Sequence, residues 1–153
     1  MIIEQRVTVA APPDRVWDFV MDVPAVSQCV PGAESVVPLG DDTYQGVLRL
    51  RVGPVALRLE GKITLAERDQ AARHARIDLQ ATDKRLGGAV NGKLQLQLEQ
   101  GAADRDQQTD LAIQADVAIL GKLGEFGQPV IRKKAEQMIA EFARNLSRQV
   151  GAG

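Results

Sequence analysis

The chain is poor in the residues that build disulfides, zinc sites and aromatic binding cages. Its 153 residues include one cysteine, Cys29, and one histidine, His74. An internal disulfide is therefore impossible, and a cysteine-based zinc site cannot be assembled. Aromatic residues make up only 3% of the chain, too few for an aromatic cage or a base-stacking platform. A lone thiol fits a reducing cytoplasm, and any apolar cavity must be lined mainly by aliphatic side chains.

The sequence also lacks an excess of either charge and lacks long apolar runs. With 19 basic and 20 acidic residues spread along the chain, the formal net charge is -1, which gives no sign of the clustered basic surface that nucleic acid requires. The first residues show no basic region followed by an apolar run, and no run of about eighteen apolar residues occurs. We therefore expect a cytoplasmic protein that binds neither DNA nor RNA.

Hydrophobic residues make up 44% of the chain, enough for one well-covered core, so we expect a single domain over residues 1–150. Several segments alternate between apolar and polar residues, which is the period of a strand that is buried on one face only. A glycine-proline turn at Gly53–Pro54 joins two of them as a hairpin. These predicted antiparallel strands cover residues 3–9, 43–52, 55–65, 74–80, 93–98 and 110–117.

Helical periodicity appears in two places. After Pro12–Pro13 the apolar residues Val16, Trp17 and Val20 predict a short helix, which Pro24 breaks before a further helical turn through 25–27. From Phe126 to Leu146 apolar residues recur at three- and four-residue steps, which predicts one long amphipathic helix ending at 151–153. This helix must cover the dry face of the sheet, so the fold class is α+β, a curved antiparallel sheet that grips a C-terminal helix.

A curved sheet around one helix can enclose a cavity or can pack to a solid core, and the pattern leaves both open. Tyr44 falls in the inward row of side chains. Its hydroxyl either binds a ligand carbonyl or belongs to a core tyrosine and reaches the backbone or the rim of the sheet. We expect the access point near the glycines of residues 121–127. The predicted ligand-binding residues are inward strand residues and apolar residues leading into the long helix: Tyr44, Leu48, Leu57, Leu59, Leu79, Leu96, Ile113, Leu123, Phe126 and Val130.

No catalytic or metal-binding residue is predicted. Strand alternation places His74 on the polar face beside Arg76 and Asp78, where it cannot act as a base in an internal cavity. Cys29 has no base beside it in the sequence, so we interpret it as a structural residue. The basic turn Arg132–Lys134 is interpreted mainly as a solvated helix face, with contact to acidic lipid or an acidic partner as the alternative.

Several local motifs carry a resemblance to a known family. They are APPDRVWDF at 11–19, CVPGAES at 29–35, VGPV at 52–55, LGGAVNG at 86–92 and GKLG at 121–124. In this combination the chain resembles the CoxG family of carbon monoxide dehydrogenase subunits, within the START-like or SRPBCC superfamily. The resemblance implies a helix-grip fold with two short helices after the first strand and a hydrophobic cavity.

The resemblance also implies a non-catalytic role beside a molybdenum hydroxylase of the carbon monoxide dehydrogenase type. Members of the family are associated with recruiting that enzyme to the membrane and with binding a lipophilic molecule. A quinone that accepts the enzyme's electrons is the expected cargo, a lipid is the other, and no further cofactor is implied. Membrane-anchoring members carry an apolar tail after this domain. For a chain that stops at Gly153, we expect ligand binding without direct anchoring, in the cytoplasm, with peripheral contact at the inner face of the cell membrane as the alternative.

Two rival functions follow from the same residues. An enzyme of the superfamily, such as a cyclase or hydrolase, would need inward polar groups within reach of each other, for example His74 or Asp78 close to Tyr44. An adaptor with a filled core would dock the enzyme to the membrane through its surface and bind no small molecule. The size and lining of the cavity discriminate between these functions.

Overall fold

The computed structural model describes residues 1–101 and 107–151. Seven strands, three α-helices and one 3₁₀ turn follow each other within these ranges. In chain order they are β1 (Ile2–Val9), α1 (Pro13–Met21), α2 (Val23–Ser27), β2 (Ala33–Gly40), β3 (Thr43–Val52), β4 (Val55–Asp69), β5 (His74–Asp83), β6 (Gly88–Gln100), β7 (Thr109–Gly121), η1 (Lys122–Phe126) and α3 (Gln128–Gly151).

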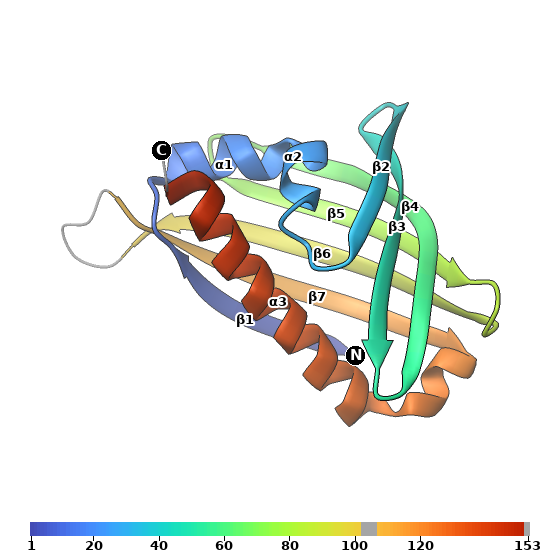
Figure 1. Cartoon of the computed structure of the whole chain (residues 1–153). Helices are drawn as coiled ribbons and strands as arrows, with labels where there is room; N and C mark the ends of the chain where they lie inside the picture. The colour runs from blue at the N-terminus through green and yellow to red at the C-terminus, as the bar shows by residue number, and fades with distance from the viewer. Residues whose placement is uncertain (102–106, 152–153) are drawn as a thin grey trace.

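All strands join one antiparallel sheet in the order β1-β7-β6-β5-β4-β3-β2. The sheet curves, and α3 runs along its concave side while α1 and α2 lie together at one end (Figure 1). Alternation decides which side chains face the concave side: Leu57, Leu59 and Leu65 of β4 are buried, whereas Arg58 is exposed. The expected α+β class with two short helices and a gripped C-terminal helix is confirmed.

Gly61 has the backbone of β5 close beside it. It pairs with Gly46 on one side and Ala81 on the other. A Cβ at Gly61 would lie 1.9 Å from the Gln80 carbonyl oxygen and 2.6 Å from the Ala81 Cα. Only a residue without a side chain fits there.

The strand β2 is not among the strands that the sequence predicts. It lies at the edge of the sheet, and its pairing with β3 is interrupted between Glu34 and Val37 and again between Pro38 and Gly40. Val37 and Leu39 are about half exposed, at 53% and 50%, so the alternation that marks a half-buried strand is missing. Irregular pairing and a proline also protect an edge strand from joining another chain.

The long helix begins later than the periodicity predicts. Residues Lys122–Phe126 form the 3₁₀ turn η1, and Gly127, with φ of 85°, separates it from α3. Phe126 therefore does not belong to the helix, which is a correction to the sequence interpretation. The helix includes Gly151, and residues 152–153 of the expected end lie outside the described residues.

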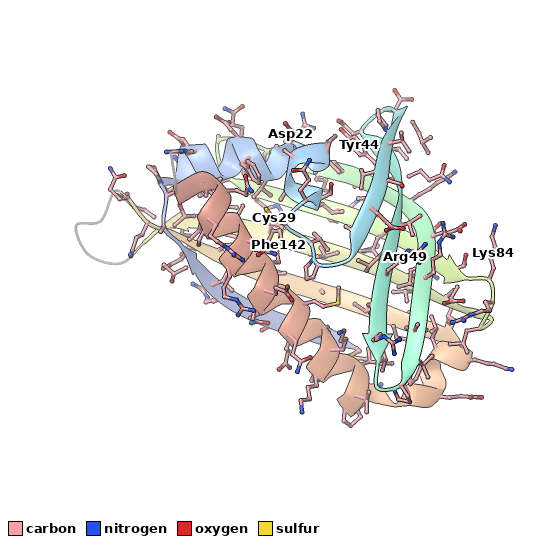
Figure 2. The ribbon with its side chains drawn as sticks, viewed as in Figure 1. Asp22, Cys29, Tyr44, Arg49, Lys84 and Phe142 are labelled. Atoms are coloured by element: carbon pink, nitrogen blue, oxygen red, sulfur yellow. The ribbon has the colours of Figure 1, made fainter. Side chains whose placement is uncertain are left out.

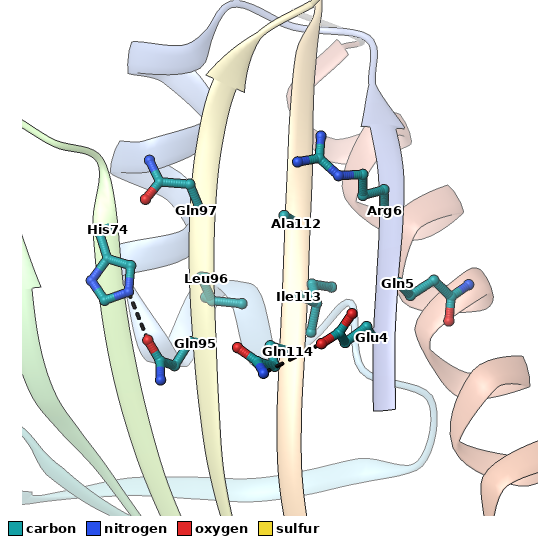
Figure 3. A pocket seen from close by; sticks show the side chains of 10 residues that line it. All are labelled: Glu4, Gln5, Arg6, His74, Gln95, Leu96, Gln97, Ala112, Ile113 and Gln114. Carbon is teal, nitrogen blue, oxygen red and sulfur yellow. Dashed lines mark hydrogen bonds between the residues drawn. The ribbon is translucent and has the colours of Figure 1, made fainter. Parts of the chain in front are cut away.

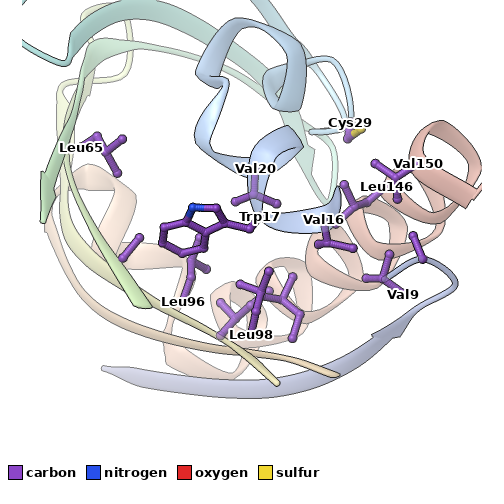
Figure 4. Close-up of a cluster of buried hydrophobic side chains, with 14 residues drawn as sticks. Val9, Val16, Trp17, Val20, Cys29, Leu65, Leu96, Leu98, Leu146 and Val150 are labelled. Carbon is purple, nitrogen blue, oxygen red and sulfur yellow. The ribbon is translucent and has the colours of Figure 1, made fainter. Parts of the chain in front are cut away.

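Two apolar clusters occupy the two ends of the concave side. The larger packs Trp17 and Val16 of α1 and Leu146 and Val150 of α3 against β1, β5, β6 and β7 (Figure 4). The smaller lies at the β3–β4 hairpin, where Val52, Leu57, Leu59 and Leu123 are buried together. The helix follows this division: Ala143, Leu146 and Val150 are buried, whereas no side chain between Gln128 and Phe142 is fully buried.

The close approach at Gly61 predicts a large penalty for any side chain there. The variant Gly61→Ala should lose about 1–3 kcal/mol of unfolding free energy, because backbone atoms of β5 would have to move. Urea denaturation followed by circular dichroism measures the change. Gly124→Ala is the matched control, since its Cβ would meet only the Ile119 carbonyl oxygen at 3.7 Å. Equal stability of the two variants would contradict a close approach of backbone at Gly61.

Candidate ligand-binding site

A cavity of about 390 Å³ lies between the concave side of the sheet and the three helices. Its volume falls within the range of about 300–1,000 Å³ that is usual for small-molecule sites. The strands contribute inward residues such as Leu48, Leu59, Ile63, Ile77 and Leu79. The other side is formed by Val23 and Val26 of α2, Val30 and Val36 after it, and Met138, Ile139 and Phe142 of α3.

The lining is almost entirely apolar. Its polar members are Ser27, Lys62 and Gln80. The Ser27 hydroxyl donates a hydrogen bond to the Pro24 carbonyl oxygen at 2.8 Å, so its proton is not free to bind a ligand. Lys62 and Gln80 are exposed and belong by alternation to the outer face. A charged ligand group would lose its water here without gaining a partner, so the cavity suits an uncharged, largely hydrocarbon molecule.

The structure brings half of the predicted ligand-binding residues together. Leu48, Leu59, Leu79, Leu96 and Ile113 line the cavity. The other five lie elsewhere. Leu57, Leu123 and Phe126 belong to the smaller apolar cluster. Tyr44 is half-buried in the β2–β3 part of the sheet (Figure 2), and Val130 is 47% exposed. Residues 121–127 therefore do not border the cavity as expected. Leu123 is 3% exposed and packs so closely on Gly88 that a Cβ there would lie 2.4 Å from its Cγ.

Sequence reasoning misses the cavity wall that comes from α2 and the middle of α3. The periodicity of the long helix places Met138 and Phe142 in its apolar stripe, which is typical of core residues. Val23, Val26 and Val30 follow at three- and four-residue steps, which is a signal for one apolar helical face. Pro24 falls inside this segment and favours a turn there, whereas in the structure that proline stands in the first turn of α2.

His74 lies on the outer face of the sheet. Its Nε2 is 3.0 Å from Gln95 Oε1, beside a shallow groove of about 480 Å³ lined mainly by polar residues of β1, β6 and β7 (Figure 3). Asp78 pairs with Arg76 at 3.3 Å and does not line the cavity. The inward acid-base pair that an enzyme of this outline would need is therefore not formed by these residues. Among the described residues, no group of three or more His, Cys, Asp or Glu side chains is placed to hold a metal ion.

Cys29 is a packing residue in the larger cluster. Its side chain is 1% exposed, and burial raises the pKa of its thiol above the ordinary value. The thiol is therefore protonated near neutral pH and is not an activated nucleophile. Its backbone carbonyl accepts a hydrogen bond from Asn145 Nδ2 of α3 at 2.9 Å.

Asp83 fixes the turn between β5 and β6, next to the smaller apolar cluster. Its carboxylate is 2% exposed and accepts hydrogen bonds from the backbone N–H of Leu86 at 2.8 Å and of Arg58 at 2.9 Å. These two bonds, first Leu86 and then Arg58, hold the pKa of Asp83 below its ordinary value. The turn carries Leu86, which packs on the smaller cluster.

Comparison with protein families identifies the chain. A model of the family described as the CoxG subunit of carbon monoxide dehydrogenase matches residues 6–151. The chain belongs to the CoxG family. The resemblance seen in the sequence motifs is thereby confirmed. A search of curated protein sequences finds no match.

Solved structures share the fold of this CoxG-family chain at low sequence identity. A conserved protein from Geobacillus kaustophilus matches with a TM-score of 0.88 and 19% identity over 99% of this chain and 96% of its own. A START superfamily protein from Mycobacterium smegmatis has a TM-score of 0.66 and 15% identity over 99% and 97%. The Zhui aromatase/cyclase from Streptomyces sp. R1128 has a TM-score of 0.65 and 19% identity over 98% and 95%. None of the described helices is long and apolar enough to cross a bilayer.

Asp83 predicts a specific acid sensitivity. Because its folded-state pKa lies below that of an unfolded aspartate, about 3.9, its contribution to stability is present above that value. The contribution is lost as pH falls through the folded-state pKa. Asp83→Asn should cost about 1–3 kcal/mol at pH 7, since its amide group keeps only one acceptor oxygen. The difference from the wild type should shrink towards pH 3.

Urea unfolding at pH 7 and pH 3 measures this difference. Glu99→Gln is the control, because Glu99 is exposed on β6. A gap between Asp83→Asn and the wild type that is the same at both pH values would show that the charge of Asp83 is irrelevant.

Proposed function

We propose that this CoxG-family protein is a non-catalytic accessory protein that holds an uncharged lipophilic molecule in its cavity. The observation that carries the proposal is the apolar cavity of about 390 Å³. A cavity of this size argues against the filled-core adaptor, because a solid core would leave no space of ligand size. The predicted residues Leu48, Leu59, Leu79, Leu96 and Ile113 are proposed to contact the ligand from the sheet side.

A quinone is the proposed cargo, and a molybdenum hydroxylase of the carbon monoxide dehydrogenase type is the proposed partner. The family description supports the partner, because it names a subunit of carbon monoxide dehydrogenase. A quinone fits the lining because it is uncharged and largely hydrocarbon. In this proposal the protein carries the electron acceptor to the enzyme, or recruits the enzyme to the acceptor, in the cytoplasm or at the inner face of the membrane.

An enzymatic function in the same cavity is the less supported alternative. A structural neighbour described as an aromatase/cyclase shows that the fold occurs in an enzyme. At 19% identity it is informative about the fold alone. Proton transfer requires a donor or acceptor that reaches the substrate, and the carboxylates and the histidine of the described residues do not line this cavity.

Native mass spectrometry of the freshly purified protein tests the cargo directly. We expect a mass excess that organic extraction releases as one stoichiometric lipophilic compound, and we expect uptake of an added short-chain quinone by protein from which the compound has been removed. A protein that is empty as purified and takes up no quinone would overturn the carrier function and favour the adaptor.

Charged substitutions locate the binding site. Leu79→Glu and Met138→Glu place a carboxylate into the cavity from the sheet and from α3, and each should weaken quinone binding by at least about tenfold. Val130→Glu is the matched control, because Val130 is exposed and does not line the cavity. Fluorescence titration gives the Kd, and thermal unfolding verifies that each variant is folded. Unchanged binding in both folded cavity variants would exclude this cavity as the site.

A further inference from the structure

One segment forms most of the cavity wall that does not come from the sheet or from α3. It comprises α2 and the turn after it, residues 23–31, and is called the cover here. Val23, Val26, Ser27 and Val30 of the cover all line the cavity. The helix α2 packs on α1 and on the edge strand β2 (Figure 1). The cover therefore borders the cavity directly through these four side chains.

The hydrogen bonds inside the cover are local turns. Val26 N–H donates to the Asp22 carbonyl, Cys29 N–H to Val26, and Val30 N–H to Ser27. The segment is fixed at its two ends, where the Asp22 side chain caps α2 through Ala25 N–H at 3.2 Å and the Gly32 carbonyl accepts from Arg49 N–H at 2.9 Å. A short segment with local bonds and two fixed ends can move as a unit without breaking the sheet.

A long-range hydrogen bond holds the cover down. Asn145 Nδ2 of α3 donates to the Cys29 carbonyl at 2.9 Å, across 116 residues of sequence. The other side of the amide, Asn145 Oδ1, accepts from Arg148 Nη2 one turn further along α3. This second bond fixes which atom of the amide faces Cys29, because a guanidinium can only donate.

The bond joins the cover to the most firmly packed part of α3. Asn145 stands between Ala143 and Leu146, which are both buried, whereas the part of the helix above the cavity is only half-buried. The fixed end of α3 therefore provides the anchor. Pro24 and Gln28 of the cover are exposed, and Val26 and Val30 are half-buried. Its fully buried side chains are those of Val23 and Cys29, so opening the cover has to take these two out of their packing.

We propose that the cover is the gate of the cavity and that Asn145 is the positioning residue that latches it shut. This inference rests on the proposed function, because a gate requires a ligand to pass. Loss of the latch raises the population of the open cover equally with and without ligand. Association and dissociation then accelerate by the same factor, and the Kd stays constant.

Stopped-flow fluorescence with the uncharged apolar dye N-phenyl-1-naphthylamine measures both rates. In Asn145→Ala, the loss of one net hydrogen bond should raise both the association and the dissociation rate constant about fivefold. Arg148→Ala should raise both by a smaller factor, since the amide keeps its donor but loses its fixed orientation. Gln149→Ala is the matched control, an exposed amide on the same helix, and should leave both rates unchanged.

Hydrogen exchange of backbone amides gives a second measurement that needs no ligand. In Asn145→Ala the amides of Val26, Cys29 and Val30 should exchange faster, while those of β6 and β7 should keep the wild-type rate. Faster exchange throughout the protein would show that Asn145 only stabilises the fold, which would overturn the gate. A weaker Kd with an unchanged association rate would overturn it as well, since Asn145 would then shape the bound state.

Failure of the proposed function is distinguishable from failure of the gate. If wild-type protein binds neither the dye nor a quinone, the carrier function is overturned and the gate with it. If wild-type protein binds the dye and Asn145→Ala exchanges it at the wild-type rates, the carrier function stands and the gate alone is overturned.

Discussion

The fold depends on keeping the concave side of one curved sheet dry with very few elements. Seven strands present their apolar rows to a single long helix and two short ones. Packing is complete where α1 and the end of α3 meet the sheet, and again where η1 closes the β3–β4 end. Between these two ends one helix is too narrow to fill the curve, and the cavity results from that mismatch between a wide curved surface and a narrow cylinder.

The same mismatch explains why the lining is chemically uniform. Strand alternation sends every charged strand residue near the cavity to the outer face, so the inward side chains are leucine, isoleucine, valine and alanine. A site with this lining selects by shape and by the absence of charge, because it has few groups to form directional bonds. Membership of the CoxG family and the shared START-like fold agree with a binding role for such a container.

Polar interactions fix turns beside the cavity and beside the smaller cluster without entering the cavity. Asp83 fixes the β5–β6 turn through two backbone N–H groups, and Asn145 fixes the turn at Cys29 through a backbone carbonyl. Each joins one side chain to backbone elsewhere in the chain, which is a strong constraint when the acceptor or donor is shielded from water. The interior thus stays apolar while its boundary is held by directional bonds.

The sequence by itself determined the class of the fold, the faces of most strands and the aliphatic character of the interior, because two- and 3.6-residue periods report burial directly. It also carried the family motifs. Only the tertiary structure decided that Leu57 and Phe126 fill a cluster while Leu79 and Phe142 border a cavity. Alternation states which side of the sheet a residue faces. Whether another side chain or open space lies opposite depends on the path of α2 and α3 across the curve, which no local pattern encodes.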